Sequence, residues 1–131
     1  MTSQQRAQQL EERLIQFAIR LVRVSDRLPS SYSGQHFGKQ IVRSGSAPAL
    51  LYAEARGAES DADFKHKCSL VLKELRETYV NLKIISGAEH LKATKLEELL
   101  RENNELISIF VATVRTVKAK LLQLEAAKKA A

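Results

Sequence analysis

The sequence has 131 residues, a length that fits one domain, and its single cysteine excludes an intramolecular disulfide framework. Aromatic residues make up 5% of the chain, with 5 glycines, 2 prolines and no tryptophan, which argues against a β-sandwich or barrel and favours long helices. The net charge of +6 is concentrated at the two ends of the sequence: +3 over residues 1–60, −1 over 61–110 and +4 over 111–131. This excess is compatible with a polyanionic partner.

The first predicted helix covers residues 4–28. Its apolar residues step by four and three, which returns them to one face every 3.5 residues. Pro29 ends this helix, because proline lacks the amide donor and restricts the residue before it. Residues 29–34 are expected to form a loop, with Ser33 as the cap of the next helix. The face consists of Leu10, Leu14, Phe17, Leu21, Val24 and Leu28.

The second predicted helix covers residues 35–58, with Phe37, Ile41, Leu51 and Ala55 on one stripe. Residues 44–49 are all small and would let another backbone approach closely. Pro48 removes one amide hydrogen bond and is expected to kink the helix, a split into two helices being the alternative.

The third predicted helix covers residues 61–86. Ser60 and Asp63 resemble a capping box, and Gly87 is a natural C-terminal stop. Cys68 lies on the apolar stripe and is expected to act as a small buried hydrophobe. That stripe again steps by four and three: Phe64, Cys68, Val71, Leu75, Thr78, Leu82 and Ile85.

The fourth predicted helix covers residues 95–123, beginning at a capping box of Thr94 and Glu97. It carries two apolar stripes, and a helix that is apolar over more than one face often contacts a second surface. Residues 124–131 either extend this helix or fray. One stripe is Leu96, Leu99, Asn103, Leu106, Phe110 and Val117; the other is Leu100, Ile107, Val114 and Leu121.

Short connections make consecutive helices antiparallel, so the sequence predicts an all-α, up-down-up-down four-helix bundle in a single domain over residues 1–131. No apolar run approaches the ~20 residues that span a bilayer, and the first residues lack the pattern of a secretory signal. We therefore expect a cytoplasmic protein without a membrane partner.

Catalytic and cofactor motifs are not evident in the chain. Residues 34–39 differ from a phosphate loop in glycine spacing and lack the preceding strand. Asp63 and His66 form one carboxylate–imidazole pair, whereas di-iron bundles need two such pairs and two further carboxylates. We therefore expect no catalytic residue, no metal, no cofactor and no small-molecule substrate.

A basic stripe is the strongest candidate binding feature. Arg6, Arg13, Arg20 and Arg27 recur every seven residues, and Arg23 lies on the same side. Such a row of guanidinium groups can contact successive phosphates, while the alternative is a set of ion pairs with neighbouring helices. The candidate nucleic-acid-binding residues are Arg13, Arg20, Arg23, Arg27, Arg43, Arg115 and Lys118, with Lys120 as a further addition.

Segments of all four predicted helices, in order, carry a family resemblance. The segments are 17–22 with 28–29, 38–46 with 52–56, 63–67 with 73–78, and 104–112. Together they resemble the bacterial "four helix bundle protein" family. Its members include proteins encoded in intervening sequences of large-subunit (23S) ribosomal RNA, and accessory proteins of diversity-generating retroelements are related to it.

The resemblance implies a ring-shaped homopentamer, a nucleic-acid partner (RNA or an RNA–DNA intermediate) and no enzymatic activity. Ala47 and Leu51 depart from the family pattern, which has Ser and Asn there, and Pro48 is unusual for the family. Three hypotheses follow. The first is a non-enzymatic, oligomeric nucleic-acid-binding bundle. The second is a structural bundle that binds an acidic protein, and the third is a metal-dependent bundle enzyme.

Overall fold

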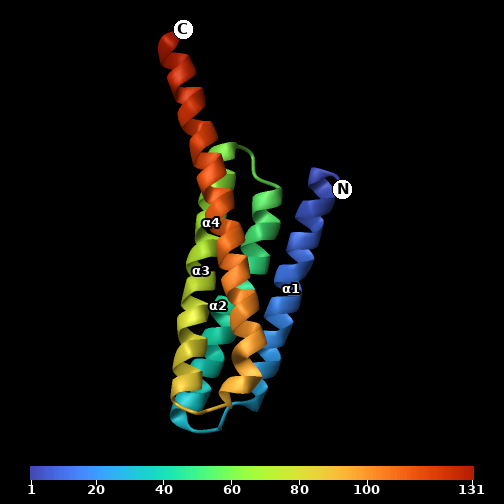
Figure 1. The fold of residues 1–131 in the computed structure, drawn as a ribbon, viewed down its shortest axis with the longest axis vertical. Coiled ribbons are helices and arrows are strands. Elements are labelled where there is room, and N and C mark those ends of the chain that lie inside the picture. The colour runs from blue at the N-terminus through green and yellow to red at the C-terminus, as the bar shows by residue number, and fades with distance from the viewer.

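The computed structural model describes residues 1–131 and contains four helices joined by short turns. Figure 1 shows them as an up-down-up-down bundle, in which each helix is antiparallel to the next. The predicted fold class is therefore confirmed. The helices are α1 (Ser3–Arg27), α2 (Tyr32–Arg56), α3 (Asp61–Gly87) and α4 (Ala93–Ala130).

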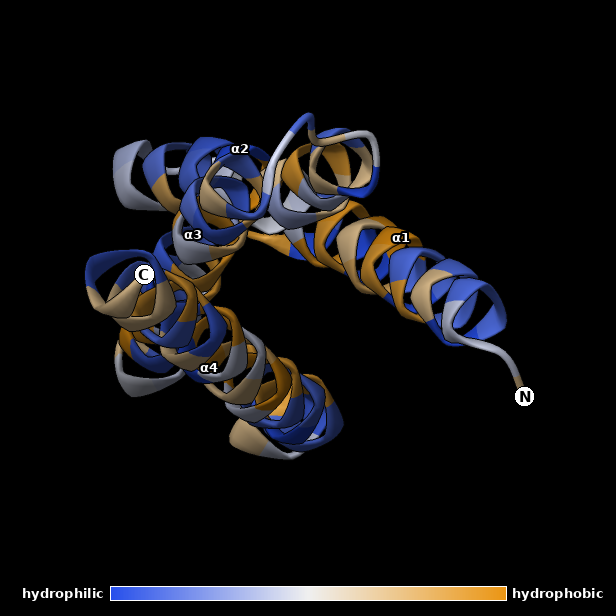
Figure 2. Cartoon of the chain, turned by 90° about the horizontal axis from the view of Figure 1, so that it is seen from above, coloured by the Kyte–Doolittle hydropathy of each residue, from blue (hydrophilic) through white to orange (hydrophobic).

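The bundle is closed on three sides and open on the fourth. α1 packs along α2, α2 along α3 and α3 along α4, whereas α1 and α4 make little contact. Seen from above in Figure 2, α1 and α4 diverge from each other. Each helix still directs its apolar stripe inward, so one continuous core forms despite the open side.

The core contains most of the predicted stripes. Fifteen hydrophobic residues are buried in one cluster, and Leu10, Val24, Leu28 and Phe37 pack partly buried against it. Cys68 is fully buried, as predicted. The predicted apolar stripe of α2 omitted Tyr52. This residue is buried and packs edge-on against Phe110, with ring centroids 5.4 Å apart.

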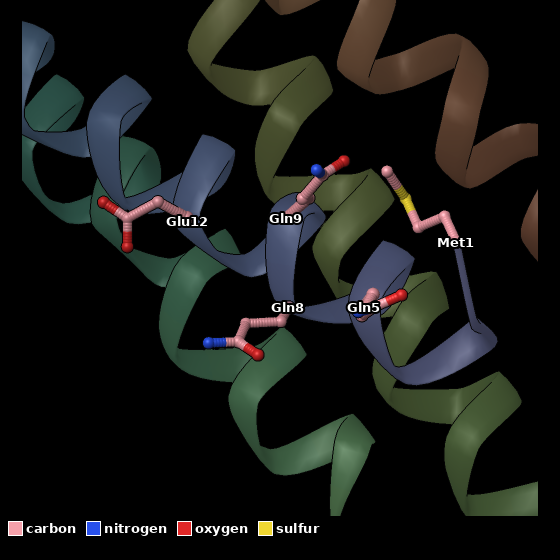
Figure 3. Close-up of a pocket in the computed structure, with 5 residues that line it drawn as sticks. All are labelled: Met1, Gln5, Gln8, Gln9 and Glu12. Atoms are coloured by element: carbon pink, nitrogen blue, oxygen red, sulfur yellow. The ribbon is translucent and has the colours of Figure 1, made fainter.

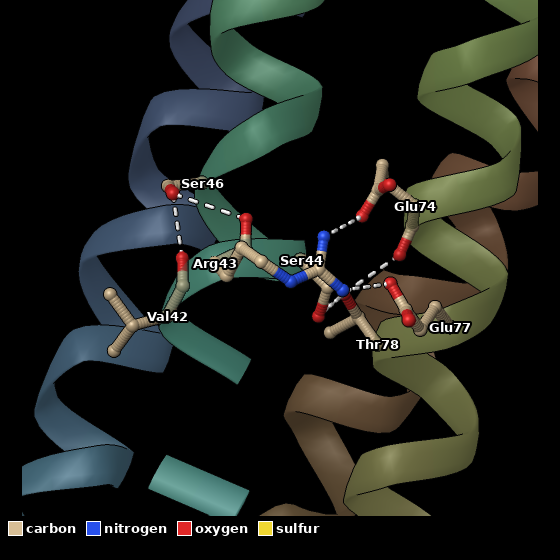
Figure 4. Close-up of polar contacts among 7 residues, drawn as sticks. All are labelled: Val42, Arg43, Ser44, Ser46, Glu74, Glu77 and Thr78. Atoms are coloured by element: carbon tan, nitrogen blue, oxygen red, sulfur yellow. Dashed lines mark hydrogen bonds and ion pairs between the residues drawn. The ribbon is translucent and has the colours of Figure 1, made fainter. Parts of the chain in front are cut away.

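A polar layer crosses the middle of this core. Thr78 Oγ1 lies 2.8 Å from Ser44 Oγ, and both side chains are fully buried (Figure 4). Asn103 Nδ2 donates to the Leu75 carbonyl at 3.0 Å, while Asn103 Oδ1 has no hydrogen-bond partner. Buried polar groups of this kind favour the one helix register that satisfies them.

The small-residue segment of α2 allows a close approach to α1. A Cβ atom at Gly45 would lie 2.0 Å from Leu21 Cδ1, so only glycine fits without rearrangement. Pro48 is buried inside α2, which is continuous through it. The alternative of two separate helices was therefore wrong.

Two predicted caps were wrong. The N-cap of α2 is Ser31, which accepts a hydrogen bond from the Gly34 amide, and Ser33 lies in the first turn instead. Gly34, in this first turn, lies against the Pro29 carbonyl, where a Cβ atom would come within 2.0 Å of the oxygen. α4 starts at Ala93, with Lys92 at the N-cap and no side-chain cap, so Thr94 has no capping role.

The turn between α3 and α4 explains the missing cap. α3 ends at Gly87, as predicted, but the left-handed residue is Glu89, with φ 58°. The amides of Ala88, Glu89 and His90 bond carbonyls in the last turn of α3. This tight turn fixes where α4 begins, independently of Thr94.

At its C-terminus α4 is longer than predicted. The segment 124–131 was expected either to extend this helix or to fray, and the helix runs to Ala130 and extends beyond the other three helices (Figure 1). Alanine, leucine, lysine and glutamate have high helix propensity, which favours continuation without tertiary contacts.

Candidate nucleic-acid interface

Arg13, the first residue of the predicted basic site, is held by carboxylates of α4. Its Nε donates to Glu102 Oε2 at 2.8 Å and its Nη2 to Glu102 Oε1 at 2.6 Å. Glu105 Oε2 lies 3.1 Å from the same Nη2. The hydrogen bonds to Glu102 raise the pKa of Arg13, and this two-pronged geometry is the strongest form of an arginine–carboxylate pair. Arg13 is therefore a link between α1 and α4.

Arg43 on α2 is held in a similar way by α3. Figure 4 shows its guanidinium group between Glu74, with Nη1 at 3.1 Å from Oε2, and Glu77, to which Nη2 donates. The hydrogen bond from Arg43 lowers the pKa of Glu77, whereas burial raises the pKa of Glu74. With two carboxylates facing it, Arg43 has little unbalanced positive charge.

Three further arginines of α1, Arg20, Arg23 and Arg27, have no carboxylate partner. Arg23 and Arg27 are exposed, and Arg20 is half-buried. None of the three forms an ion pair or a side-chain hydrogen bond within the chain. Arg27 lies in the last turn of α1, where its charge also interacts favourably with the helix dipole.

Arg20 borders a hollow of about 430 Å³ between α1 and α4, whose other lining residues are Glu98, Arg101, Glu102 and Glu105. The sequence-based prediction missed Arg101. The only sequence feature that could have indicated Arg101 was that α4 could pack beside α1. Neither helix alone reveals which of its charged residues face the other. The hollow thus places two arginines beside three glutamates.

The basic residues of α4 lie at the other end of the bundle. Arg115 and Lys118 are exposed and have no ion pair, while Lys120 Nζ lies 3.1 Å from Asp61 Oδ2. Because α1 and α4 run in opposite directions, the C-terminal end of α1 is far from the C-terminal end of α4 (Figure 1). The predicted residues therefore form two exposed groups and two carboxylate-bound arginines, and they do not form one continuous face.

Other chemically capable side chains are dispersed. Ser33 Oγ lies 2.9 Å from His90 Nε2, a contact that joins the start of α2 to the turn before α4. The Asp63 amide donates to the Ser60 cap, and His66 is exposed. Burial raises the pKa of the Cys68 thiol to about 11. No group of three histidine, cysteine, aspartate or glutamate residues is placed to hold a metal ion.

A second hollow, of about 470 Å³, lies along the start of α1. Figure 3 shows its lining residues, which are Met1, Gln5, Gln8, Gln9 and Glu12. All five come from one end of a single helix, and no second element closes over them. Amides and one carboxylate on a convex helix surface do not converge on a ligand as side chains in a binding cleft do.

No helix combines the length and apolarity required to cross a membrane.

Comparisons with known proteins give a consistent result. A family model described as "23S rRNA-intervening sequence protein" matches residues 6–112. A crystal structure from Bacteroides thetaiotaomicron, described as a protein of unknown function from the S23 ribosomal protein family, is similar to this chain. Its TM-score is 0.75 at 27% sequence identity, and the match covers 80% of this chain and 97% of that one. No curated protein matches the chain.

Proposed function

Because the chain belongs to the 23S rRNA-intervening sequence protein family, we propose that it is a non-enzymatic, oligomeric, cytoplasmic bundle that binds nucleic acid. The proposed ligand is RNA or an RNA–DNA intermediate. The proposed contact is the exposed side of α1. One observation carries the proposal: Arg20, Arg23 and Arg27 have no carboxylate partner, whereas Arg13 and Arg43 do.

The geometry of these three residues suits a phosphate chain. Seven residues of helix rise about 10 Å, so Arg20 and Arg27 are separated by roughly that distance along α1, with Arg23 between them. Guanidinium groups bind phosphate oxygens through planar forks, and none of the three is in an ion pair here, although Arg20 borders the hollow that three glutamates line. With only 3 tyrosines and 4 phenylalanines in the chain, stacking on bases has few candidate residues. Binding is therefore expected to be dominated by phosphate contacts and to discriminate poorly between sequences.

The test is a salt titration of binding to a structured RNA and to duplex DNA. The variant is Arg20→Gln with Arg27→Gln, and the charge-matched control is Lys73→Gln with Lys83→Gln, two exposed lysines of α3. Both pairs lower the net charge by two and keep residues that favour helices. The wild type is expected to lose affinity steeply with salt, with a log–log slope of about −0.7 to −0.9 for each phosphate neutralised.

The arginine variant is expected to bind more weakly and with a smaller slope than the control. Equal binding by the variant and the wild type would show that the α1 arginines are not the contact. A wild type that binds neither polymer at low salt would refute the nucleic-acid proposal and leave the acidic-protein partner as the better hypothesis. A third pair, Arg115→Gln with Lys118→Gln, tests whether the exposed group on α4 contributes.

Assembly is the second part of the proposal. We propose a cyclic homo-oligomer, most simply the pentamer that the family resemblance implies. Two features support it: the second apolar stripe of α4 stays half-exposed at Leu100, Ile107 and Val114, and Ile15 and Val22 on α1 are 37% and 42% exposed. Light scattering is expected to give a multiple of the 14.7 kDa chain mass, and a 14.7 kDa species at micromolar concentration would contradict assembly.

A further inference from the structure

Along the C-terminal end of α4, the apolar face is half-buried at Val117 and Leu121 and more exposed beyond them. We define residues 118–130 as the arm. Val117, Leu121 and Leu124 step by four and three and so continue the face that Leu106 and Phe110 bury in the core. Leu124 is 49% exposed, because the arm extends beyond the other helices (Figure 1). The family match ends at residue 112, so the arm lies outside the part of the chain that the family model describes.

A groove with both apolar and polar lining residues lies at the same end of the bundle. It has a volume of about 640 Å³ and is bordered by the first turns of α1, the end of α2 and the start of α3. We call it the end groove. Its apolar lining residues are Ala7, Tyr52, Ala55, Ala58 and Phe64, of which Tyr52 and Ala55 are only 5% and 1% exposed. The Tyr52 side chain is almost completely buried, and its hydroxyl forms no hydrogen bond within the chain.

The arm and the end groove have opposite charge. Residues 118–129 contain four lysines and one glutamate, a net charge of +3. The charged residues that line the end groove are Arg56, Glu59 and Asp61, a net charge of −1, and Glu54 and Asp63 lie close to them in the sequence. Lys120 already lies 3.1 Å from Asp61 within one chain, so lysines of α4 and carboxylates of this groove do pair.

The same ion pair shows why the arm does not fill its own groove. Lys120 is beside the groove at Asp61, and from there α4 continues as a straight helix away from the other helices (Figure 1). Neither Leu121 nor Leu124 lines the groove of its own chain. A second copy can bring its arm to the groove without breaking a helix.

We propose that the arm of one copy packs into the end groove of a second copy, with Leu121 and Leu124 against Phe64. This inference rests on the proposed homo-oligomeric assembly and identifies a contact within it. The contact is head-to-tail, because it joins two different surfaces of the chain. A contact of this type repeats from copy to copy and closes into a ring when the rotation between neighbours permits.

The first experiment measures mass by light scattering on full-length variants whose helix content is checked by circular dichroism. The arm variant is Leu121→Gln with Leu124→Gln, and the groove variant is Ala7→Arg, which adds bulk and positive charge to the groove wall. Each is expected to shift the wild-type oligomer toward 14.7 kDa. The matched control is Leu122→Gln, which removes a leucine that is 57% exposed from a different face of the arm and is expected to leave the oligomer unchanged.

The second experiment mixes the two variants. The arm variant keeps an intact groove and the groove variant keeps an intact arm, so a head-to-tail contact predicts 1:1 pairs and nothing larger. Failure of the mixture to pair would overturn the proposal. An arm variant that assembles like the wild type would also overturn it while leaving assembly itself intact, whereas a monomeric wild type would refute both. Nucleic-acid binding is measured separately and does not depend on these outcomes.

Discussion

The α2–α3 interface and the α1–α4 interface are held together by different interactions. Between α2 and α3, apolar residues surround the buried Ser44–Thr78 hydrogen bond, and ion pairs lie outside it. Between α1 and α4, the polar contacts are the pairs of Arg13 with Glu102 and Glu105, beside a charged hollow. The first interface is fixed by burial and hydrogen-bond geometry, whereas the second depends on charge and so on ionic strength.

Apolar burial is expected to produce the largest difference between the two interfaces. Leu75→Ala removes a fully buried side chain of α3, and such truncations cost about 2–5 kcal/mol of the free energy of unfolding. Leu10→Ala, in the half of α1 that diverges from α4, removes a partly buried side chain and is expected to cost less. Urea unfolding measures both, and equal losses would show that the two interfaces are packed equally well.

The buried hydroxyl pair tests the polar part of the α2–α3 interface. Thr78→Val keeps the shape but leaves the Ser44 hydroxyl buried without its partner, which is expected to cost about 1–3 kcal/mol. Adding Ser44→Ala removes the unpaired group, so the double variant is expected to recover much of the loss. Additive losses in urea unfolding would mean that the two hydroxyls do not act as a pair.

The corresponding test of the α1–α4 interface is Arg13→Gln. The Arg13 and Glu102 side chains are 34% and 18% exposed, so solvent weakens the pair and the expected loss is about 0.5–1 kcal/mol at low salt. A double-mutant cycle with Glu102→Gln isolates the coupling, and this coupling is expected to shrink in 1 M salt. Coupling that is unaffected by salt would indicate a pair shielded from water, contrary to an open interface.

Cys68 lies in the core near the diverging ends of α1 and α4. At neutral pH its ionisation is expected to change the free energy of unfolding less than any of the substitutions above. Burial raises its pKa from 9.0 to about 11, so the unfolded thiol ionises first as pH rises. Stability is fully present below about pH 9 and falls as pH rises from 9 toward 11. Urea unfolding at a series of pH values, with Cys68→Ala as control, measures this loss.

The rate of thiol alkylation is a second measure of how well the core shields Cys68 from water. A thiol with a pKa near 11 has roughly a hundredfold less thiolate at neutral pH than one with a pKa near 9. The native protein is therefore expected to react slowly and the unfolded protein quickly. Rapid alkylation of the native protein would show that water enters the core where α1 and α4 diverge.

Much of the candidate site could not be predicted from sequence. The heptad spacing correctly indicated that Arg13, Arg20 and Arg27 lie on the same side of α1. It did not distinguish Arg13 from the other two, because Glu102 is 89 residues away and meets Arg13 only through the packing of α4. Arg43 was separated from the unpaired arginines in the same way by Glu74 and Glu77 of α3.

The sequence by itself determined the four helices, most of their apolar faces and the family, because local spacing sets which side chains share a helix face. Tertiary structure decided the open side of the bundle, the caps at Ser31 and Lys92, and which arginines are neutralised. These features depend on contacts between residues distant in the chain. Their geometry is set by how whole helices pack, which no single stretch of sequence specifies.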